Sequence, residues 1–293
     1  MSRERPESPA PLGVRRPSIR RRAWNGMLTL LCYTAALLVI LPLALILWHV
    51  VRLGLPALSP AFFLNLPKPV GESGGGMVNA IVGTGLMVMM GTLLSVPIGV
   101  GAGLYLAEHG NGRFGTLVRT TADVLAGVPS IVIGVAAYGL VVIPMGRFSG
   151  LAGGVALALI MLPTIVRSTE EVVRLVPRSY REAALALGAP RWRVIQEVVL
   201  PAAAPAVATV VLLALARAAG ETAPLLFTAL GSRFWSVAID RPMASLPVYI
   251  YDYARAPYDD WNRQAWTAAL VLLMLVTVVS ALVRFTTRRI PRP

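Results

Sequence analysis

Arg217 and Glu221 are two opposite charges placed four positions apart, and Arg217 lies within a long apolar run. On a helix this spacing puts both side chains on one face. A charge at the centre of a bilayer costs roughly 2.5–3.5 kcal/mol on insertion scales, so it usually faces a bundle interior and serves a purpose there. The planar fork of arginine suits the oxygens of phosphate groups, and Glu221 could orient Arg217 and moderate its attraction. The pair could hold an anion in passage, or it could be a structural ion pair in the bundle or against a second subunit.

A second candidate is the stretch EAALALGAPRWRVIQEVVLP at residues 182–201. Its first six residues are strong helix formers. Gly188 suits a left-handed helix end, and Pro190 can start a new helix. Arg191–Val199 would form that helix, and Leu200-Pro201 lead into the next apolar run. The pattern predicts a helical hairpin. The alternative is an ordinary basic loop that only orients the neighbouring helices.

The elements that must position these residues are apolar helices. The chain has 293 residues, 56% of them hydrophobic, and several runs exceed the roughly 18 residues that a membrane span needs. We expect an all-α integral membrane protein in which residues 25–293 form one transmembrane domain and residues 1–24, rich in Arg and Pro, form a disordered tail. The six expected spans cover residues 27–50, 77–106, 122–143, 151–167, 203–221 and 265–283, with a loop at 168–202.

The charge distribution orients these spans. The net charge is +13, but the basic residues flank apolar runs instead of forming one aromatic and basic face, which argues against nucleic-acid binding. With both termini in the cytoplasm, the cytoplasmic segments hold 19 basic residues and the opposite side holds seven. An odd number of spans would place one Arg-rich terminus outside, so the positive-inside rule favours six.

The other charged and polar groups have simple structural interpretations. Two i,i+4 pairs, Arg167 with Glu171 and Glu170 with Arg174, predict a solvated, self-paired helix face, with contact to a partner protein as the alternative. Asp123 is expected to favour a helix N-terminus. The segment 231–264, rich in tyrosine, is expected to lie along the membrane interface.

Signals for catalysis or a resident cofactor are weak. Gly71-Glu72-Ser73-Gly74-Gly75 matches a hydrolase nucleophile motif, but it lies in a glycine-rich loop with no strand before it. No nucleotide-binding P-loop occurs. His49 and His109 are far apart, neither with another ligand type at metal spacing, and Cys32 is the single cysteine. We therefore expect no catalytic residue, no metal site and no enzyme.

The stretch 182–201 resembles the cytoplasmic "EAA" loop of ABC importer permeases. That loop has Glu-Ala-Ala, a glycine, an aliphatic residue and Leu-Pro at fixed separations. The matching positions here are Glu182, Ala183, Ala184, Gly188, Val198, Leu200 and Pro201, with Val in place of the commoner Ile. Other stretches resemble phosphate importer permeases of the PstA type: GGGMVNAIVGT (74–84), GVPSIVIG (127–134), the segment 162–192, RAAGETAPLLFTAL (217–230) and PMASLPVYIYDYA (242–254).

The resemblance implies a six-helix bundle of the type I ABC importer permease class in the bacterial inner membrane. It implies that the 182–201 loop, including Arg191 and Arg193, couples the chain to an ATPase, and that Arg217 and Glu221 line the path of inorganic phosphate. The implied partners are a second permease (PstC type), two ATPase subunits (PstB type) that bind ATP and Mg, a binding protein (PstS type) and membrane lipid, but no nucleic acid.

Two rival functions remain open at this point. The chain could be a permease for another oxyanion, such as phosphonate, sulfate or molybdate, since a separate binding protein would hold much of the selectivity. It could also be a secondary transporter or channel that works without ATP, although the coupling motif would then have no purpose. A role in reporting phosphate sufficiency could coexist with transport.

Overall fold

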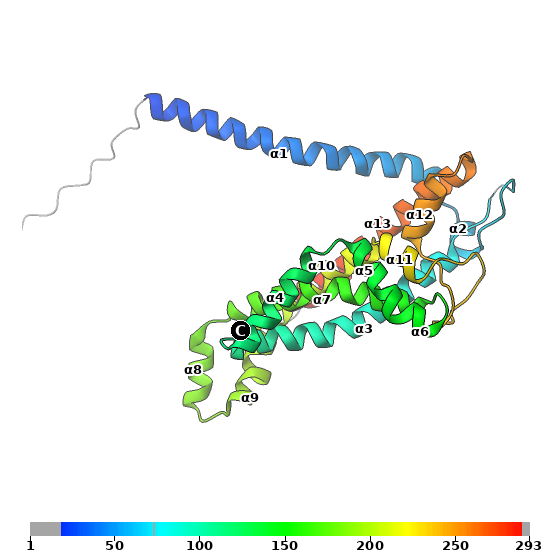
Figure 1. Ribbon diagram of the computed structural model, residues 1–293. Coiled ribbons are helices and arrows are strands. Elements are labelled where there is room, and N and C mark those ends of the chain that lie inside the picture. Colours follow the sequence, from blue (N-terminus) through cyan, green and yellow to red (C-terminus); the bar gives the residue numbers. More distant parts are fainter. Residues whose placement is uncertain (1–18, 73, 289–293) are drawn as a thin grey trace, which may run out of the picture. The chain divides into compact units, whose positions relative to one another are not determined.

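The computed structural model describes residues 19–72 and 74–288. The described part is helical, with one isolated β-bridge between Leu230 and Met243. Its elements, drawn in Figure 1, are α1 (Ile19–Gly54), η1 (Leu55–Ala57), α2 (Pro60–Leu64), α3 (Val78–His109), α4 (Arg113–Gly127), α5 (Ser130–Ala137), η2 (Tyr138–Val142), α6 (Ile143–Met145), α7 (Gly150–Arg174), α8 (Arg178–Ala186), α9 (Arg191–Arg193), η3 (Val194–Val199), α10 (Leu200–Ala219), α11 (Ala223–Thr228), α12 (Leu246–Ala254) and α13 (Asp259–Arg288).

The chain divides into two compact units, residues 1–49 and 50–293. The described part of the first unit is most of α1, whose apolar side chains are exposed all around the helix. Residues 19–24, expected in the tail, already belong to α1. That boundary was wrong because arginines are good helix formers and extend the helix past its apolar run. The remainder of the expected tail, residues 1–18, lies outside the described residues.

Within the described residues, five helices are long and apolar enough to cross a membrane. The expected span at 122–143 is not one straight helix, because α4 and the helical run Ser130–Met145 meet at an angle of 107°. Pro129 stands at this break, and proline disfavours helical backbone in the residue before it. The count reaches six if the bent pair makes one span.

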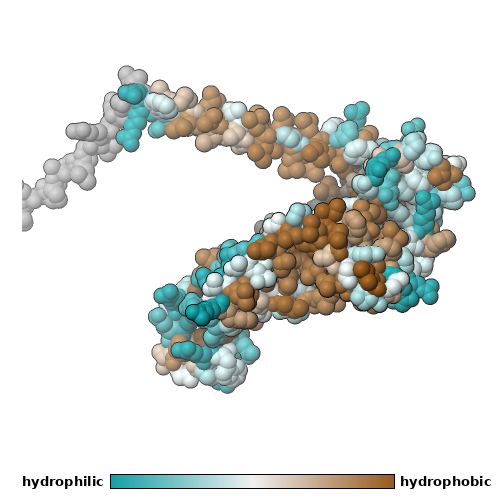
Figure 2. All heavy atoms as spheres, viewed as in Figure 1, coloured by the Kyte–Doolittle hydropathy of each residue, from teal (hydrophilic) through white to brown (hydrophobic). Residues whose placement is uncertain are grey.

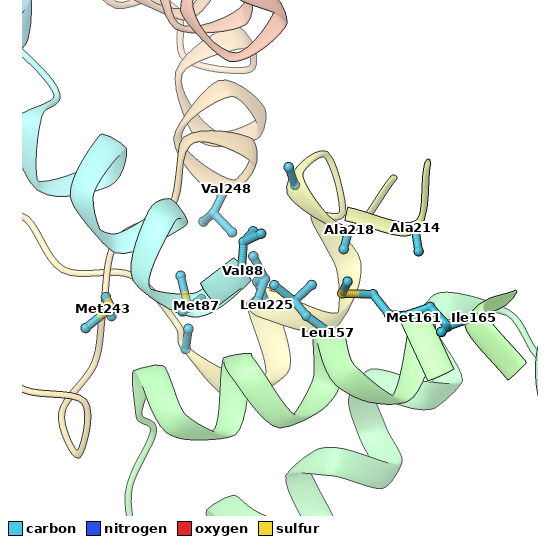
Figure 3. Packing of buried hydrophobic residues seen from close by; sticks show 12 residues of the cluster. Met87, Val88, Leu157, Met161, Ile165, Ala214, Ala218, Leu225, Met243 and Val248 are labelled. Carbon is cyan, nitrogen blue, oxygen red and sulfur yellow. The ribbon is translucent and has the colours of Figure 1, made fainter. Parts of the chain in front are cut away.

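The core of the second unit is the interface between α3 and α7, to which α10 and α11 add side chains. Its buried members include Met87, Leu157, Met161, Ile165 and Leu225, which point toward one another in Figure 3. Small residues make the close approach possible. A side chain on Gly99 would lie 2.7 Å from Ile165, and one on Gly103 would lie 2.6 Å from Thr169. Helices in membranes pack through such small residues.

A second core cluster corrects the expectation for residues 231–264. Tyr249, Tyr253 and Trp261 are buried together with Phe62 of α2, and the rings of Tyr253 and Trp261 stack at 4.3 Å. The segment therefore packs inside the protein instead of only lying along an interface. The sequence suggested otherwise because amphipathic aromatic rings suit both places.

Polar and apolar surfaces are separated in this unit. In Figure 2 hydrophobic side chains gather over the middle of the helix bundle, and hydrophilic ones gather at the end where α8 and α9 lie. Figure 1 shows α8 and α9 projecting beyond the helices of the bundle at that end. The fold thus presents the stretch 178–193 as a separate polar projection.

Candidate functional site

The stretch 182–201 folds as a helix, a turn and a second helical run. α8 holds Glu182, Ala183 and Ala184, and its end is closed by hydrogen bonds from Gly188 N to Leu185 O (2.9 Å) and from Ala189 N to Ala184 O (3.2 Å). Gly188 has a φ of +83°, the left-handed conformation that the sequence predicted. Pro190 then precedes α9. We call residues 178–193 the coupling segment.

The coupling segment has an inner and an outer side. Ala184 and Ala189 pack against an apolar cluster that contains the buried Val173 and Val194. Glu182 and Ala183 are exposed. Exposed apolar side chains accompany them: Leu187 is 89% exposed, and Trp192 and Leu185 are also open to solvent. Exposed apolar groups rimmed by polar ones mark protein interaction sites, so the outer side is suited to bind a partner protein.

The two arginines of α9 differ in their surroundings. Arg193 Nε lies 3.6 Å from Glu197 Oε1, and the Arg193 guanidinium lies over the Trp192 ring, 5.3 Å from its centroid. Arg191 is exposed on the same short helix. Arg191 is therefore the more available cation for a partner, while Arg193 also orders its own segment.

Arg217 and Glu221 do meet, with Nε and Oε1 3.5 Å apart. They do not share a helix, because α10 ends at Ala219 and Gly220 caps it. Arg217 is 59% exposed and Glu221 only 17%, while Ala214 and Ala218 of α10 turn into the core. Arg217 thus points away from the packed side of the bundle, and its position at a helix end was not apparent from the apolar run.

The coupling segment and the Arg217–Glu221 pair lie far apart but on one continuous element. Residues Arg191–Ala219 form a single helical run of 29 residues, of which η3 is a π-helical part. At 1.5 Å per residue this run separates Arg191 from Arg217 by about 39 Å. The expected loop at 168–202 is accordingly shorter, because α7 continues to Arg174 and the next long helical run starts at Arg191.

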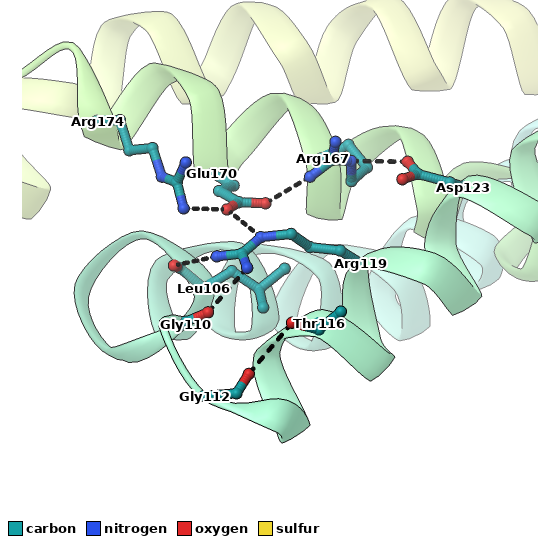
Figure 4. Close-up of polar contacts among 9 residues, drawn as sticks. All are labelled: Leu106, Gly110, Gly112, Thr116, Arg119, Asp123, Arg167, Glu170 and Arg174. Atoms are coloured by element: carbon teal, nitrogen blue, oxygen red, sulfur yellow. Dashed lines mark hydrogen bonds and ion pairs between the residues drawn. The ribbon is translucent and has the colours of Figure 1, made fainter.

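A buried charge cluster replaces the solvated face expected around Glu170. Glu170 is 2% exposed, and its carboxylate accepts from Arg119 Nε (2.7 Å), Arg167 Nη1 (2.8 Å) and Arg174 Nη2 (2.7 Å). Figure 4 shows these three guanidinium groups around the carboxylate. The pair Glu170–Arg174 was predicted correctly. The solvated interpretation was wrong because α4 packs over this face of α7 and brings Arg119 to it.

Asp123 also has a role that differs from the expected one. It lies in the third turn of α4, and its carboxylate pairs with Arg167 Nε at 2.8 Å. The expectation of a helix N-terminus failed because α4 begins at Arg113, ten residues before Asp123. No sequence signal pointed to Arg119, since its partner is 51 positions away.

Relatives of this chain support an importer permease. The family described as "Binding-protein-dependent transport system inner membrane component" matches residues 99–292. The "Phosphate transport system permease protein PstA" of Yersinia pestis is 42% identical over 265 residues, covering 90% of each chain. "Phosphate transport system permease protein PstA 1" of Mycobacterium tuberculosis (strain ATCC 25618 / H37Rv) is 36% identical over 303 residues, covering 99% of this chain and 97% of the relative.

Solved structures share the fold. A chain of the MetNI methionine ABC transporter, solved in inward-facing conformations, matches 73% of this chain and 97% of its own length with a TM-score of 0.62 and 20% identity. A chain of a bacterial ABC transporter involved in the import of the acidic polysaccharide alginate matches 92% of this chain and 96% of its own, with a TM-score of 0.59 and 16% identity. At these identities the likeness concerns the fold alone.

Proposed function

The chain belongs to the family of inner-membrane components of binding-protein-dependent transport systems, and from this premise we propose that it is the permease subunit of an ATP-driven importer of inorganic phosphate. Its relatives over nearly the whole length are named as phosphate transport permeases. The chain is a permease and not an enzyme, and ATP hydrolysis belongs to a separate subunit. It works in the inner membrane with an ATPase and a binding protein.

The observation that carries the mechanism is the continuous helical run Arg191–Ala219. One end belongs to the coupling segment with its exposed Glu182, Ala183 and Arg191, and the other end carries Arg217. We infer that the ATPase binds the outer side of the coupling segment and that Arg217 meets phosphate in the translocation path. A displacement of the coupling segment would then shift Arg217 directly, because a helix is stiff along its axis.

The pair Arg217–Glu221 suits a site that must bind and release. The guanidinium is more than half exposed, so it is available to a phosphate oxygen, and the 3.5 Å contact with Glu221 offsets part of its charge. A single exposed arginine attracts an anion weakly in water. We propose that the second permease, of the PstC type, completes the path, and that PstB-type ATPases and a PstS-type binding protein complete the complex. Both termini of the chain would lie in the cytoplasm.

Phosphate uptake by cells that lack this gene tests the proposal. Wild type should restore high-affinity uptake. Arg217→Ala should abolish uptake while the ATPase still copurifies with the complex, and Gly188→Trp should abolish uptake by disturbing the coupling segment. Wild-type complementation without phosphate uptake would leave a permease for another oxyanion. Uptake that continues without any ATPase would instead indicate an ATP-independent transporter.

A further inference from the structure

One side chain of the coupling segment reaches inward instead of outward. Arg181 is 20% exposed and makes four hydrogen bonds. Its Nε and Nη2 donate to Glu108 Oε1 (3.2 and 2.8 Å), Nη1 donates to Val176 O (2.6 Å), and Nη2 also donates to Val173 O (3.1 Å). Through one guanidinium, α8 is therefore attached to two different transmembrane helices.

The first attachment is to the end of α7. The last carbonyls of a helix lack regular partners within the helix. Arg181 donates to the carbonyl of Val173 in the last turn of α7 and to that of Val176, two residues after α7 ends. A cation at a helix C-terminus also interacts favourably with the helix dipole. Because only Leu175–Pro177 separate α7 from α8, this contact holds the angle at which α8 leaves the membrane helix.

The second attachment is to the end of α3, 73 residues earlier in the chain. Glu108 stands one residue before the end of α3 and is 16% exposed, so both partners are largely removed from solvent. Two surface pockets, of about 440 and 230 Å³, are both lined by Glu108 and Arg181. The surroundings of the pair are thus partly hollow, and the ion pair itself supplies a direct, directional link between α3 and α8.

Apolar packing alone would hold the coupling segment less firmly. The groups of α8 and its turn that pack inward are the small Ala184 and Ala189. Alanine buries little area, and hydrophobic contact has no direction. A guanidinium fork, by contrast, fixes distance and orientation at once.

We propose that Arg181 is the positioning residue that makes α8, α7 and α3 move as one body when the ATPase displaces the coupling segment. This rests on the proposed function, because it assumes that an ATPase binds the coupling segment. α3 is a 32-residue helix, so movement imposed at Glu108 reaches the far end of the bundle along one element. The route runs in parallel with the helical run Arg191–Ala219, which starts from the other half of the coupling segment.

The test uses the whole complex, with its second permease and ATPase, in proteoliposomes. Copurified ATPase, ATP hydrolysis and phosphate transport are measured for Arg181→Gln, Arg181→Lys, Glu108→Gln and the double variant Glu108→Gln/Arg181→Gln. Arg113→Gln is the matched control: Arg113 is an exposed arginine at the start of α4, outside the coupling segment, and its side chain makes no hydrogen bond or ion pair within residues 19–72 and 74–288.

Arg181→Gln should retain the ATPase and its hydrolysis, but phosphate moved per ATP should fall at least about fivefold, the lower end of typical coupling effects. Arg181→Lys keeps the charge without the fork and should restore part of the ratio. The double variant should be no worse than Arg181→Gln, because the two residues act as a unit. The Arg113→Gln control should couple as wild type does.

Three results would overturn the proposal. The first is an unchanged amount of phosphate moved per ATP in Arg181→Gln, and the second is fully additive effects of the two single changes. The third is loss of the ATPase from every Arg181 and Glu108 variant, which would make the pair merely structural. A measurement that does not depend on the transported anion distinguishes failure of this proposal from failure of the phosphate assignment. In a Cys32→Ser background, Leu93→Cys places a thiol at an exposed position of α3. Its alkylation rate should change on ATP and vanadate trapping, and Arg181→Gln should abolish that change even if the wild-type complex carries another anion.

Discussion

Arg119 Nε lies 2.7 Å from Glu170 Oε1, and through this contact α4 is attached to α7. The same guanidinium donates to the carbonyls of Leu106 (3.1 Å) and Gly110 (2.8 Å) at the end of α3. Arg181 makes the reverse set of contacts. It donates to carbonyls in the last turn of α7 and just after it, and it forms an ion pair with Glu108 of α3. Two arginines from different elements thus tie the ends of α3 and α7 together.

Glu170→Gln should lower the stability of the complex strongly. The change leaves Arg119, Arg167 and Arg174 around a group that cannot balance their charge, and breaking a largely buried ion pair costs about 3 kcal/mol or more. Thermal unfolding of the purified complex in detergent measures this. Glu171→Gln is the control, because Glu171 is the exposed neighbour and should change little. Equal effects of the two changes would contradict the view that Glu170 organises the cluster.

Which residues position 188 tolerates should depend on the backbone conformation there and not on the space around it. The φ of Gly188 is +83°, yet a side chain there would meet no atom within 4 Å. Gly188→Asn should therefore keep the ATPase bound and uptake largely intact, since asparagine tolerates the left-handed region. Gly188→Val should cost roughly 1–2 kcal/mol at this turn and reduce ATPase copurification. Similar behaviour of the two variants would show that φ is not the decisive factor.

Two glycines of α3 should respond in opposite ways to alanine. A Cβ at Gly103 would lie 2.6 Å from Thr169 Cβ and 2.7 Å from Val166 O, so Gly103→Ala should force α3 and α7 apart and destabilise the complex by about 1–3 kcal/mol. Gly101 has nothing within 4 Å, and Gly101→Ala should be neutral or stabilising because alanine favours helix. The unfolding temperatures of the two variants test this. A lower unfolding temperature for Gly101→Ala would indicate that a neighbouring subunit packs against this glycine.

Arg217→Ala should separate transport from stability. The ion pair with Glu221 is exposed on the arginine side, and such pairs contribute about 0–1 kcal/mol. The unfolding temperature should therefore barely change, while phosphate uptake should be lost. Arg217→Lys keeps a cation but not the fork and should retain a fraction of the uptake with weaker substrate affinity. A large fall in stability with unchanged uptake per assembled complex would make the pair structural.

Tyr249 should make the protein sensitive to alkaline pH. Burial raises the pKa of Tyr249 from 10.0 to about 12, although the hydrogen bond from Asn79 opposes this. Because the folded pKa exceeds the unfolded one, the stability contribution is complete below pH 10 and is lost as pH rises toward about 12, by up to about 2–3 kcal/mol. The free energy of unfolding, measured across this pH range, should fall less steeply with pH in Tyr249→Phe than in the wild type. Tyr251→Phe, at an exposed neighbouring ring, should keep the wild-type slope.

Several parts of this protein follow from its sequence alone. Uninterrupted apolar runs require helices, because the backbone of a membrane span must satisfy its own hydrogen bonds. The turn at Gly188 follows likewise, since glycine readily takes a positive φ and Pro190 can start the next helix. Both are local properties, decided by residues within a few positions of one another.

Tertiary structure alone decided the partners of the charged residues. Glu170 is equally compatible with a solvated helix face and with a buried cluster until α4 lies over α7. Arg181 and Glu108 are 73 positions apart, and nothing in their local sequences pairs them. Ion pairs depend on distance and on removal from water, which the chain sets only when α3, α7 and α8 come together. The bend of 107° after α4 is of the same kind: Pro129 marks a break, but neighbouring helices set its angle.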